Sequence, residues 1–166
     1  RRLLEIRGVE AGLDEVTDRF ETLYQGTDDS PGLRRFETLR IDRPTLERLA
    51  ARLPLAVVTG RPRCDAVRFL EGNGIGDLFS ELICMEDAPA KPDPAPVELA
   101  LERLGVSTAW MVGDTPDDLQ AARGAGVLPI GVTAPGDDKT VMTRALEDAG
   151  AAKVLERPDE IEEILH

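Results

Sequence analysis

The stretch Ala109-Trp-Met-Val-Gly-Asp-Thr-Pro-Asp-Asp118 decides the fold of this chain. Its apolar run 109–112 ends abruptly at Gly113-Asp114, and a helical pattern begins a few residues later. The pattern predicts a buried strand with Asp114 at its carboxyl end, the edge at which open α/β sheets bind their ligands. Asp118 follows one helical turn after Asp114, so both carboxylates can face one small volume. Because paired carboxylates repel each other unless a cation lies between them, the pair points to a hard cation such as Mg²⁺.

Helices and strands alternate along the chain from Ile41 to its end. The predicted helices cover 45–52, 63–73, 94–104, 117–124, 139–149 and 158–165, and the predicted strands cover 55–58, 82–85, 109–112, 128–132 and 153–155. Such alternation implies parallel pairing with right-handed crossovers. We therefore expect an α/β domain of three layers, a Rossmann-like parallel sheet with helices on both faces, over residues 41–166.

Residues 1–40 have a different pattern, which is helical only. Apolar residues recur along one face, at Leu13, Val16, Phe20, Leu23 and Tyr24. The run 25–32 is rich in turn-forming residues and interrupts the helical pattern. We predict a separate helical unit over residues 1–40, and its start, 1–4, reads as part of a helix.

Composition excludes several classes of function. The 166 residues carry a net charge of −12, which disfavours nucleic acid as a partner. No apolar run approaches membrane-spanning length, so no membrane partner is expected. Cys64 and Cys84 stand apart from any CxxC pattern, which favours reduced thiols and a cytoplasmic protein. His166 is the single histidine, so histidine-based catalysis is excluded.

Polar residues follow two other predicted strands. Thr59, Gly60 and Arg61 follow the apolar run 55–58, where a hydroxyl and an exposed backbone N–H could bind a phosphoryl oxygen. Taken alone, Thr59 fits equally well as the N-cap of the next helix, and Arg61 as a solvated residue at the start of that helix. Lys91 lies among prolines after the run 82–85, in a chain with few lysines. Taken alone, Asp117 and Asp118 also fit as helix-capping acids.

In combination, these motifs resemble those of the haloacid dehalogenase superfamily. Val58-Thr59-Gly60, Lys91-Pro92-Asp93-Pro94 and Gly113-Asp114-Thr115-Pro116-Asp117-Asp118 match its second, third and fourth motifs in order and spacing. The resemblance implies that Thr59 holds a transferring phosphoryl group, with Gly60 and Arg61 also at the substrate, and that Lys91 neutralises charge. It implies that Asp114 ligates Mg²⁺ directly and that Asp118 supports the metal or hydrogen-bonds Lys91. Asp117 is the alternative second acid.

The first motif of that family, an Asp-x-Asp-Gly sequence after the first strand, does not stand in this chain. In the family that strand lies between the strands that carry Thr59 and Asp114. Without it we expect a gap in the sheet, with unpaired backbone groups or badly altered pairing. We therefore expect the nucleophilic aspartate in a segment ahead of the sequence. Residues 1–40 then resemble part of the α-helical cap that many members insert after the first motif; an ordinary helical extension is the alternative.

The resemblance implies a Mg²⁺-dependent phosphatase that acts on a small phosphorylated metabolite through an aspartyl-phosphate intermediate. The alternative is a non-catalytic module of the same fold that binds a phospho-ligand or a protein partner. A nucleotide-binding Rossmann domain is a weaker third reading, because no GxGxxG motif follows a predicted strand.

Overall fold

The computed structural model describes residues 12–27 and 30–165, which form two compact units, one ending at Leu39 and the other beginning at Arg40. The expectation that residues 1–4 are helical falls outside the described residues. None of the described helices combines the length and the apolar character needed to cross a membrane.

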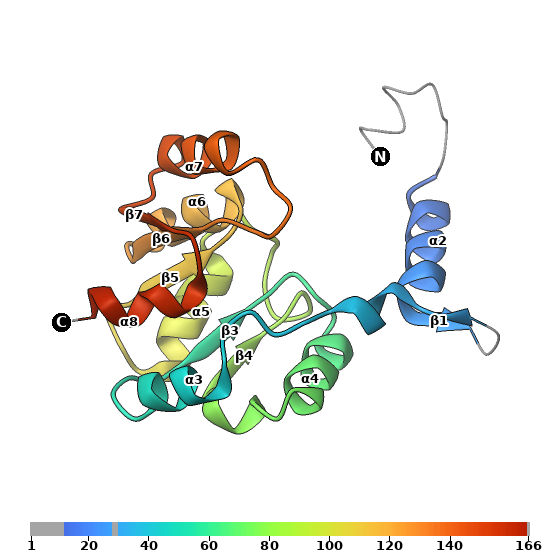
Figure 1. Ribbon diagram of the computed structural model, residues 1–166, viewed down its shortest axis with the longest axis horizontal. Helices are drawn as coiled ribbons and strands as arrows, with labels where there is room; N and C mark the ends of the chain where they lie inside the picture. Colours follow the sequence, from blue (N-terminus) through green and yellow to red (C-terminus); the bar gives the residue numbers. More distant parts are fainter. Residues whose placement is uncertain (1–11, 28–29, 166) are drawn as a thin grey trace. The chain divides into compact units, whose positions relative to one another are not determined.

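The first unit contains helix α2 (Leu13–Gln25), the short antiparallel strands β1 (Gly26–Thr27) and β2 (Ser30–Pro31), and the 3-10 helix η1 (Leu33–Phe36) (Figure 1). The prediction of a purely helical region was therefore wrong at the turn-rich run, which forms a hairpin. Gly26 takes a positive φ of 84°, and Gly32 lies against the backbone of Tyr24 and Gly26 without room for a Cβ. Glycine at both positions lets the chain reverse sharply there.

The second unit alternates helices and strands as expected, which confirms an α/β fold with parallel sheets. Its strands are β3 (Ala56–Val58), β4 (Glu81–Ile83), β5 (Trp110–Gly113), β6 (Leu128–Val132) and β7 (Lys153–Leu155). Its helices are α3 (Arg43–Ala50), α4 (Arg63–Gly72), η2 (Gly76–Leu78), α5 (Ala95–Leu104), α6 (Pro116–Gly124), α7 (Lys139–Asp148), η3 (Pro158–Glu160) and α8 (Ile161–Ile164).

Local hydrogen bonds explain where elements differ from the predicted bounds. Helix α3 begins two residues before the predicted start, because the Asp42 carboxylate accepts the backbone N–H of Thr45 and so caps the first turn. Strand β4 ends at Ile83, because the backbone N–H of Cys84 turns to the Asp87 carboxylate, 2.7 Å away. The predicted last helix begins as the 3-10 turn η3 and becomes α-helical only at α8.

Helices cover both faces of the β5–β6–β7 sheet. On one face, Ile130 of β6 packs in a buried cluster with Leu49 of α3 and Ile161 of α8. Gly131 points the opposite way, and a Cβ built there would meet Leu146 of α7 at 3.2 Å. The three-layer arrangement expected from the alternation is thus present.

The strands form two parallel sheets instead of one. β3 pairs with β4, while β5, β6 and β7 form a second sheet in that spatial order (Figure 1). No ladder joins β3 to β5 within the described part of the chain, although Val58 of β3 and Met111 of β5 pack against the same buried cluster. The strands that precede Thr59 and Asp114 therefore belong to different sheets.

Candidate active site

The first part of the candidate site is the carboxyl end of β3. The backbone N–H of Thr59 donates to the carbonyl of Ile83, 2.9 Å away, and extends the pairing with β4 by one residue. The Thr59 hydroxyl accepts the backbone N–H of Arg61 at 3.2 Å and so closes a tight turn. Helix α4 begins four residues after Thr59, with Pro62 as its N-cap residue and no side-chain cap. Thr59 is therefore not the N-cap of α4.

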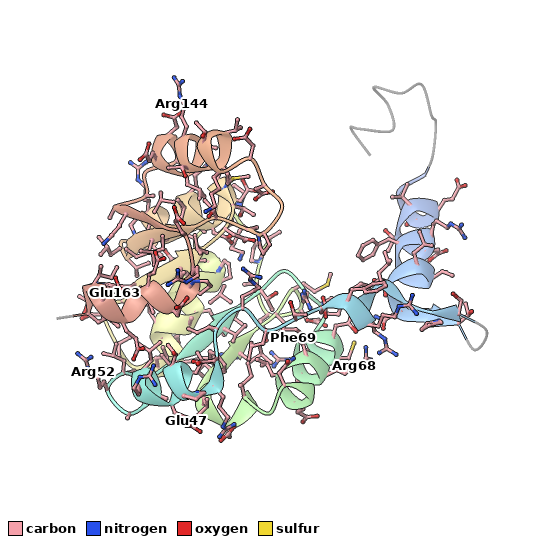
Figure 2. The ribbon with its side chains drawn as sticks, in the orientation of Figure 1. Glu47, Arg52, Arg68, Phe69, Arg144 and Glu163 are labelled. Carbon is pink, nitrogen blue, oxygen red and sulfur yellow. The ribbon has the colours of Figure 1, made fainter. Side chains whose placement is uncertain are left out.

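Gly60 and Arg61 continue this turn. Gly60 is exposed, and a Cβ added there would meet no atom within 4 Å. The guanidinium carbon of Arg61 lies 5.5 Å from the ring centroid of Phe69, which is labelled on α4 in Figure 2. A cation held over an aromatic ring in this way is oriented by the ring. Arg61 thus stands two residues from Thr59 with its side chain directed toward α4.

Lys91 lies in the loop between β4 and α5 and connects the two sheets. Its ammonium Nζ donates to the carbonyl of Val58, the last residue of β3, at 3.2 Å. The same Nζ pairs with Oδ1 of Asp118 at 2.5 Å, and the Lys91 side chain is 19% exposed. Asp93, two residues later, is used differently, because its carboxylate accepts the backbone N–H of Ala95 at the start of α5.

Asp118 is the buried acid of the site. One carboxylate oxygen pairs with Lys91, and the other accepts the backbone N–H and the hydroxyl of Thr115 at 3.1 and 2.8 Å. Burial raises the pKa of Asp118, but the hydrogen bond and charge of Lys91, with the bonds from Thr115, outweigh it, so the pKa lies below its ordinary value. Asp118 is therefore ionised at neutral pH and holds Lys91 in place.

Asp114 follows the last residue of β5, as predicted, and is the acid without a cation. Burial, and then the charge of nearby Asp118, raise the pKa of Asp114 above its ordinary value. Among residues 12–27 and 30–165, no ion pair joins Asp114 to an arginine or lysine. A cation bound beside a partly desolvated carboxylate that lies near a second acid stabilises the charged form of that carboxylate.

The structure distinguishes between the two candidates for the second acid. Asp118 is buried and contacts Lys91, whereas Asp117 is exposed. Gly113 explains part of the burial, because a Cβ built on it would lie 2.8 Å from Cγ of Asp118. Asp118 packs directly on the end of β5, and only glycine at position 113 leaves the space.

The donor set fits a hard cation at Asp114 but does not form a complete metal site. Carboxylate oxygens are the ligands that Mg²⁺ prefers. Both oxygens of Asp118 are already hydrogen-bonded or ion-paired within the protein, which leaves Asp114 as the carboxylate free to ligate. Within the described ranges, no cluster of three or more His, Cys, Asp or Glu side chains surrounds a common point.

Lys91 joins two of the predicted positions. It contacts the carbonyl of Val58, the residue before Thr59, and the carboxylate of Asp118, while Gly60 and Arg61 follow Thr59 in the turn after β3. Two participants were missed from the sequence, the Val58 carbonyl and Thr115. The spacing Thr115-x-x-Asp118 is a capping-box pattern, and that signal could have identified Thr115.

Known proteins resemble this chain over most of its length. The profile of the haloacid dehalogenase-like hydrolase family matches residues 13–132. A phosphoglycolate phosphatase of Pectobacterium atrosepticum is 40% identical over 139 residues, which cover 80% of this chain and 58% of that protein. An imidazoleglycerol-phosphate dehydratase of Phytophthora nicotianae is 48% identical over 151 residues, which cover 87% of this chain and 33% of that protein.

A solved structure shares the fold over nearly the whole chain. The crystal structure of a predicted phosphoglycolate phosphatase from Haemophilus somnus 129PT superposes with a TM-score of 0.75 and 25% identity, covering 98% of this chain and 72% of that one. The curated relatives are longer than the region they share with this chain, which spans between one third and about three fifths of the two named above.

Proposed function

Because the chain belongs to the haloacid dehalogenase-like hydrolases, we propose that it forms the core of a Mg²⁺-dependent phosphatase. The proposed reaction hydrolyses a small phosphate monoester through an aspartyl-phosphate intermediate. The observation that carries the proposal is the position of Lys91. Its ammonium is held between the end of β3 and Asp118, and a buried cation of this kind stabilises charge on a transferring phosphoryl group.

Each residue of the site has a proposed role. Thr59 hydrogen-bonds a phosphoryl oxygen through its hydroxyl, and the exposed turn at Gly60 offers a backbone N–H to the same group. Lys91 neutralises the phosphoryl charge, and Asp118 fixes the position of Lys91. Asp114 holds the metal, and Asp118 supports it through its negative charge. Bound Mg²⁺ supplies charge neutralisation at the phosphoryl oxygens and lowers the repulsion against an incoming nucleophile.

We propose that the nucleophilic aspartate is carried by a strand that inserts between β3 and β5. The strand pairing supports this proposal, since among the described residues β3 pairs only with β4 and β5 pairs only with β6. Lys91 lies at the carboxyl end of the gap, so an aspartate at the end of such a strand would stand close to the ammonium. This proposal is tested by reading the residues encoded ahead of Arg1 for an apolar strand followed by Asp-x-Asp-Gly.

The relatives suggest where to begin with substrates. Proteins similar to this chain are named phosphoglycolate phosphatase and pyrophosphatase, so phosphoglycolate and pyrophosphate are the first compounds to assay. Arg61, oriented over Phe69, is the proposed contact for a second anionic group of the substrate. Two free thiols, Cys64 and Cys84, agree with action in the reducing cytoplasm.

The decisive experiment measures phosphate release by the full-length protein from a panel of phosphate esters, with Mg²⁺ and with EDTA. We expect hydrolysis that requires Mg²⁺ and that is lost in Asp114→Asn. Hydrolysis that persists in Asp114→Asn and in EDTA would contradict the metal assignment. A folded full-length protein that releases no phosphate from any ester but binds one of them would instead favour a non-catalytic module.

A further inference from the structure

Thr115 hydrogen-bonds the carboxylate of Asp118, and that carboxylate pairs with Lys91. Oxygen Oδ1 of Asp118 pairs with Lys91 at 2.5 Å. Oxygen Oδ2 receives two hydrogen bonds from Thr115, one from the backbone N–H at 3.1 Å and one from the hydroxyl at 2.8 Å. The Thr115 hydroxyl also accepts the backbone N–H of Asp118 at 3.2 Å. A hydroxyl has one hydrogen to donate and lone pairs to accept with, so both bonds form at once.

This arrangement fixes the direction in which Asp118 points. The terminal torsion of an aspartate is broad and approximately two-fold, so the side chain alone does not select one orientation. Thr115 selects it by engaging Oδ2 twice, which leaves Oδ1 directed at Lys91. Gly113 makes room for the side chain, because a Cβ built there would lie 2.8 Å from Cγ of Asp118. The direction of the Asp118 carboxylate is therefore set by its bonds to Thr115.

The capping box of α6 differs from the other helix starts. Among the described α-helices, only α6 has both halves of a capping box. Helices α3 and α7 are capped by Asp42 and Asp138, each accepting one backbone N–H without a return bond from the third residue. In α6 the returning acid uses one oxygen for the box and the other for Lys91, so this cap also serves a residue outside the helix.

We propose that Thr115 is a positioning residue, which sets the location of the Lys91 ammonium through Asp118. The inference rests on the proposed function for its catalytic consequence, but the positioning itself can be measured without any activity. If the Thr115 hydroxyl is removed, Asp118 can rotate, and Lys91 loses its constant partner. The ammonium then spends more time away from the end of β3, where it is placed to meet a phosphoryl group.

The first test measures the reactivity of Lys91 with an amine acetylating reagent. The chain has three lysines, at positions 91, 139 and 153, and peptide mass spectrometry of the full-length protein gives each rate in the same sample. In Thr115→Val we expect Lys91 to react about five- to tenfold faster relative to Lys139 and Lys153, the ratio that corresponds to the loss of one hydrogen bond. In Thr115→Ser, which keeps the hydroxyl, the Lys91 rate should stay within about twofold of the parent.

A matched control separates positioning from the loss of a helix cap. Asp42→Ala removes the cap of α3, where the Asp42 carboxylate accepts the backbone N–H of Thr45, and should leave the Lys91 rate unchanged. Thr115→Gly is a second test in case Thr115→Val does not fold, because glycine is itself an acceptable N-cap residue but has no hydroxyl. It should increase the Lys91 rate as Thr115→Val does.

The second test is kinetic and uses the substrate identified for the full-length protein. We expect Thr115→Val to lower kcat about tenfold with KM within about twofold, and Thr115→Ser to restore kcat, since charge stabilisation acts mainly in the transition state. An unchanged Lys91 rate in folded Thr115→Val and Thr115→Gly would overturn the proposal, as would an equal increase in Asp42→Ala. If the Lys91 rate responds as expected but the parent hydrolyses no ester, the positioning stands and the proposed phosphatase function fails.

Discussion

The ion pair between Lys91 and Asp118 should contribute several times more to stability than a surface ion pair of this protein. The two charged atoms are 2.5 Å apart, and the side chains are 19% and 8% exposed. At an effective dielectric constant of about 20, Coulomb attraction at this distance is about 6–7 kcal/mol before desolvation is subtracted. Removing one member of a buried pair typically costs about 3–5 kcal/mol, because the other charge is left without a partner. We expect a net coupling energy of about 2–4 kcal/mol.

The measurement is a double-mutant cycle of unfolding free energies. Urea unfolding of the parent, Lys91→Met, Asp118→Asn and the double variant gives the coupling, provided that all four unfold with the same m-value. A parallel cycle on Lys139 and Glu156 is the control. Those side chains are paired at 2.9 Å but are 65% and 68% exposed, so solvent screening should leave no measurable coupling.

Equal coupling energies in the two double-mutant cycles would refute the reasoning. If the coupling between Lys91 and Asp118 were below about 0.5 kcal/mol, as for exposed pairs, solvent would have to screen the buried pair fully. Asp118 could then not hold Lys91 at the end of β3, and the proposed role of the pair in charge stabilisation would fail together with the prediction.

Three further predictions follow from the same site. Asp114→Asn should abolish hydrolysis without lowering the unfolding free energy, because the raised pKa of Asp114 means that its charge opposes folding at neutral pH. Gly113→Ala should lower the unfolding free energy by about 1–3 kcal/mol, since the new methyl collides with Asp118. Gly72→Ala, at a helical position with no atom near the added methyl, is the control and should leave the unfolding free energy unchanged or slightly higher. The pKa of Asp118 is lowered in the fold, so its contribution to stability is complete above its unfolded-state pKa and is lost as pH falls through the folded-state value; Asp118→Asn should therefore show a shallower loss of stability in acid.

The sequence predicted that Thr59 and Asp114 each follow a strand, because the topology leaves little choice. Strands β6 and β7 occur at the residues predicted from their apolar runs. Once strands and helices alternate, the pairing is parallel and the carboxyl ends lie at one edge. Thr59 and Asp114 each follow such a strand, so their placement followed from chain order alone. Lys91 needed the structure, because a loop residue has no periodicity to fix its direction.

The choice between Asp117 and Asp118 depended on packing that a sequence pattern does not contain. Both are acids in the first turn of α6 and both favour the helix dipole. Only the angle at which α6 leaves β5 makes Asp118 the one that packs on Gly113 and meets Lys91. The apolar face predicted for α2 shows the same limit, since Phe20 and Leu23 are 56% and 48% exposed. Periodicity identifies a face but not what packs on it.

In the proposed enzyme, one additional strand between β3 and β5 would complete both the sheet and the active site. Among the described residues, β3 pairs only with β4 and β5 only with β6. Lys91 joins the end of β3 to Asp118, and Val58 and Met111 pack against one buried cluster. A strand entering this gap would satisfy the backbone groups of both edges, which is a strong driving force because unpaired groups next to a core are costly. Its carboxyl end would arrive beside Lys91 and Asp114. In the proposed enzyme, the strand that closes the sheet is thus the strand that delivers the nucleophile, so the site cannot become competent before the sheet is complete.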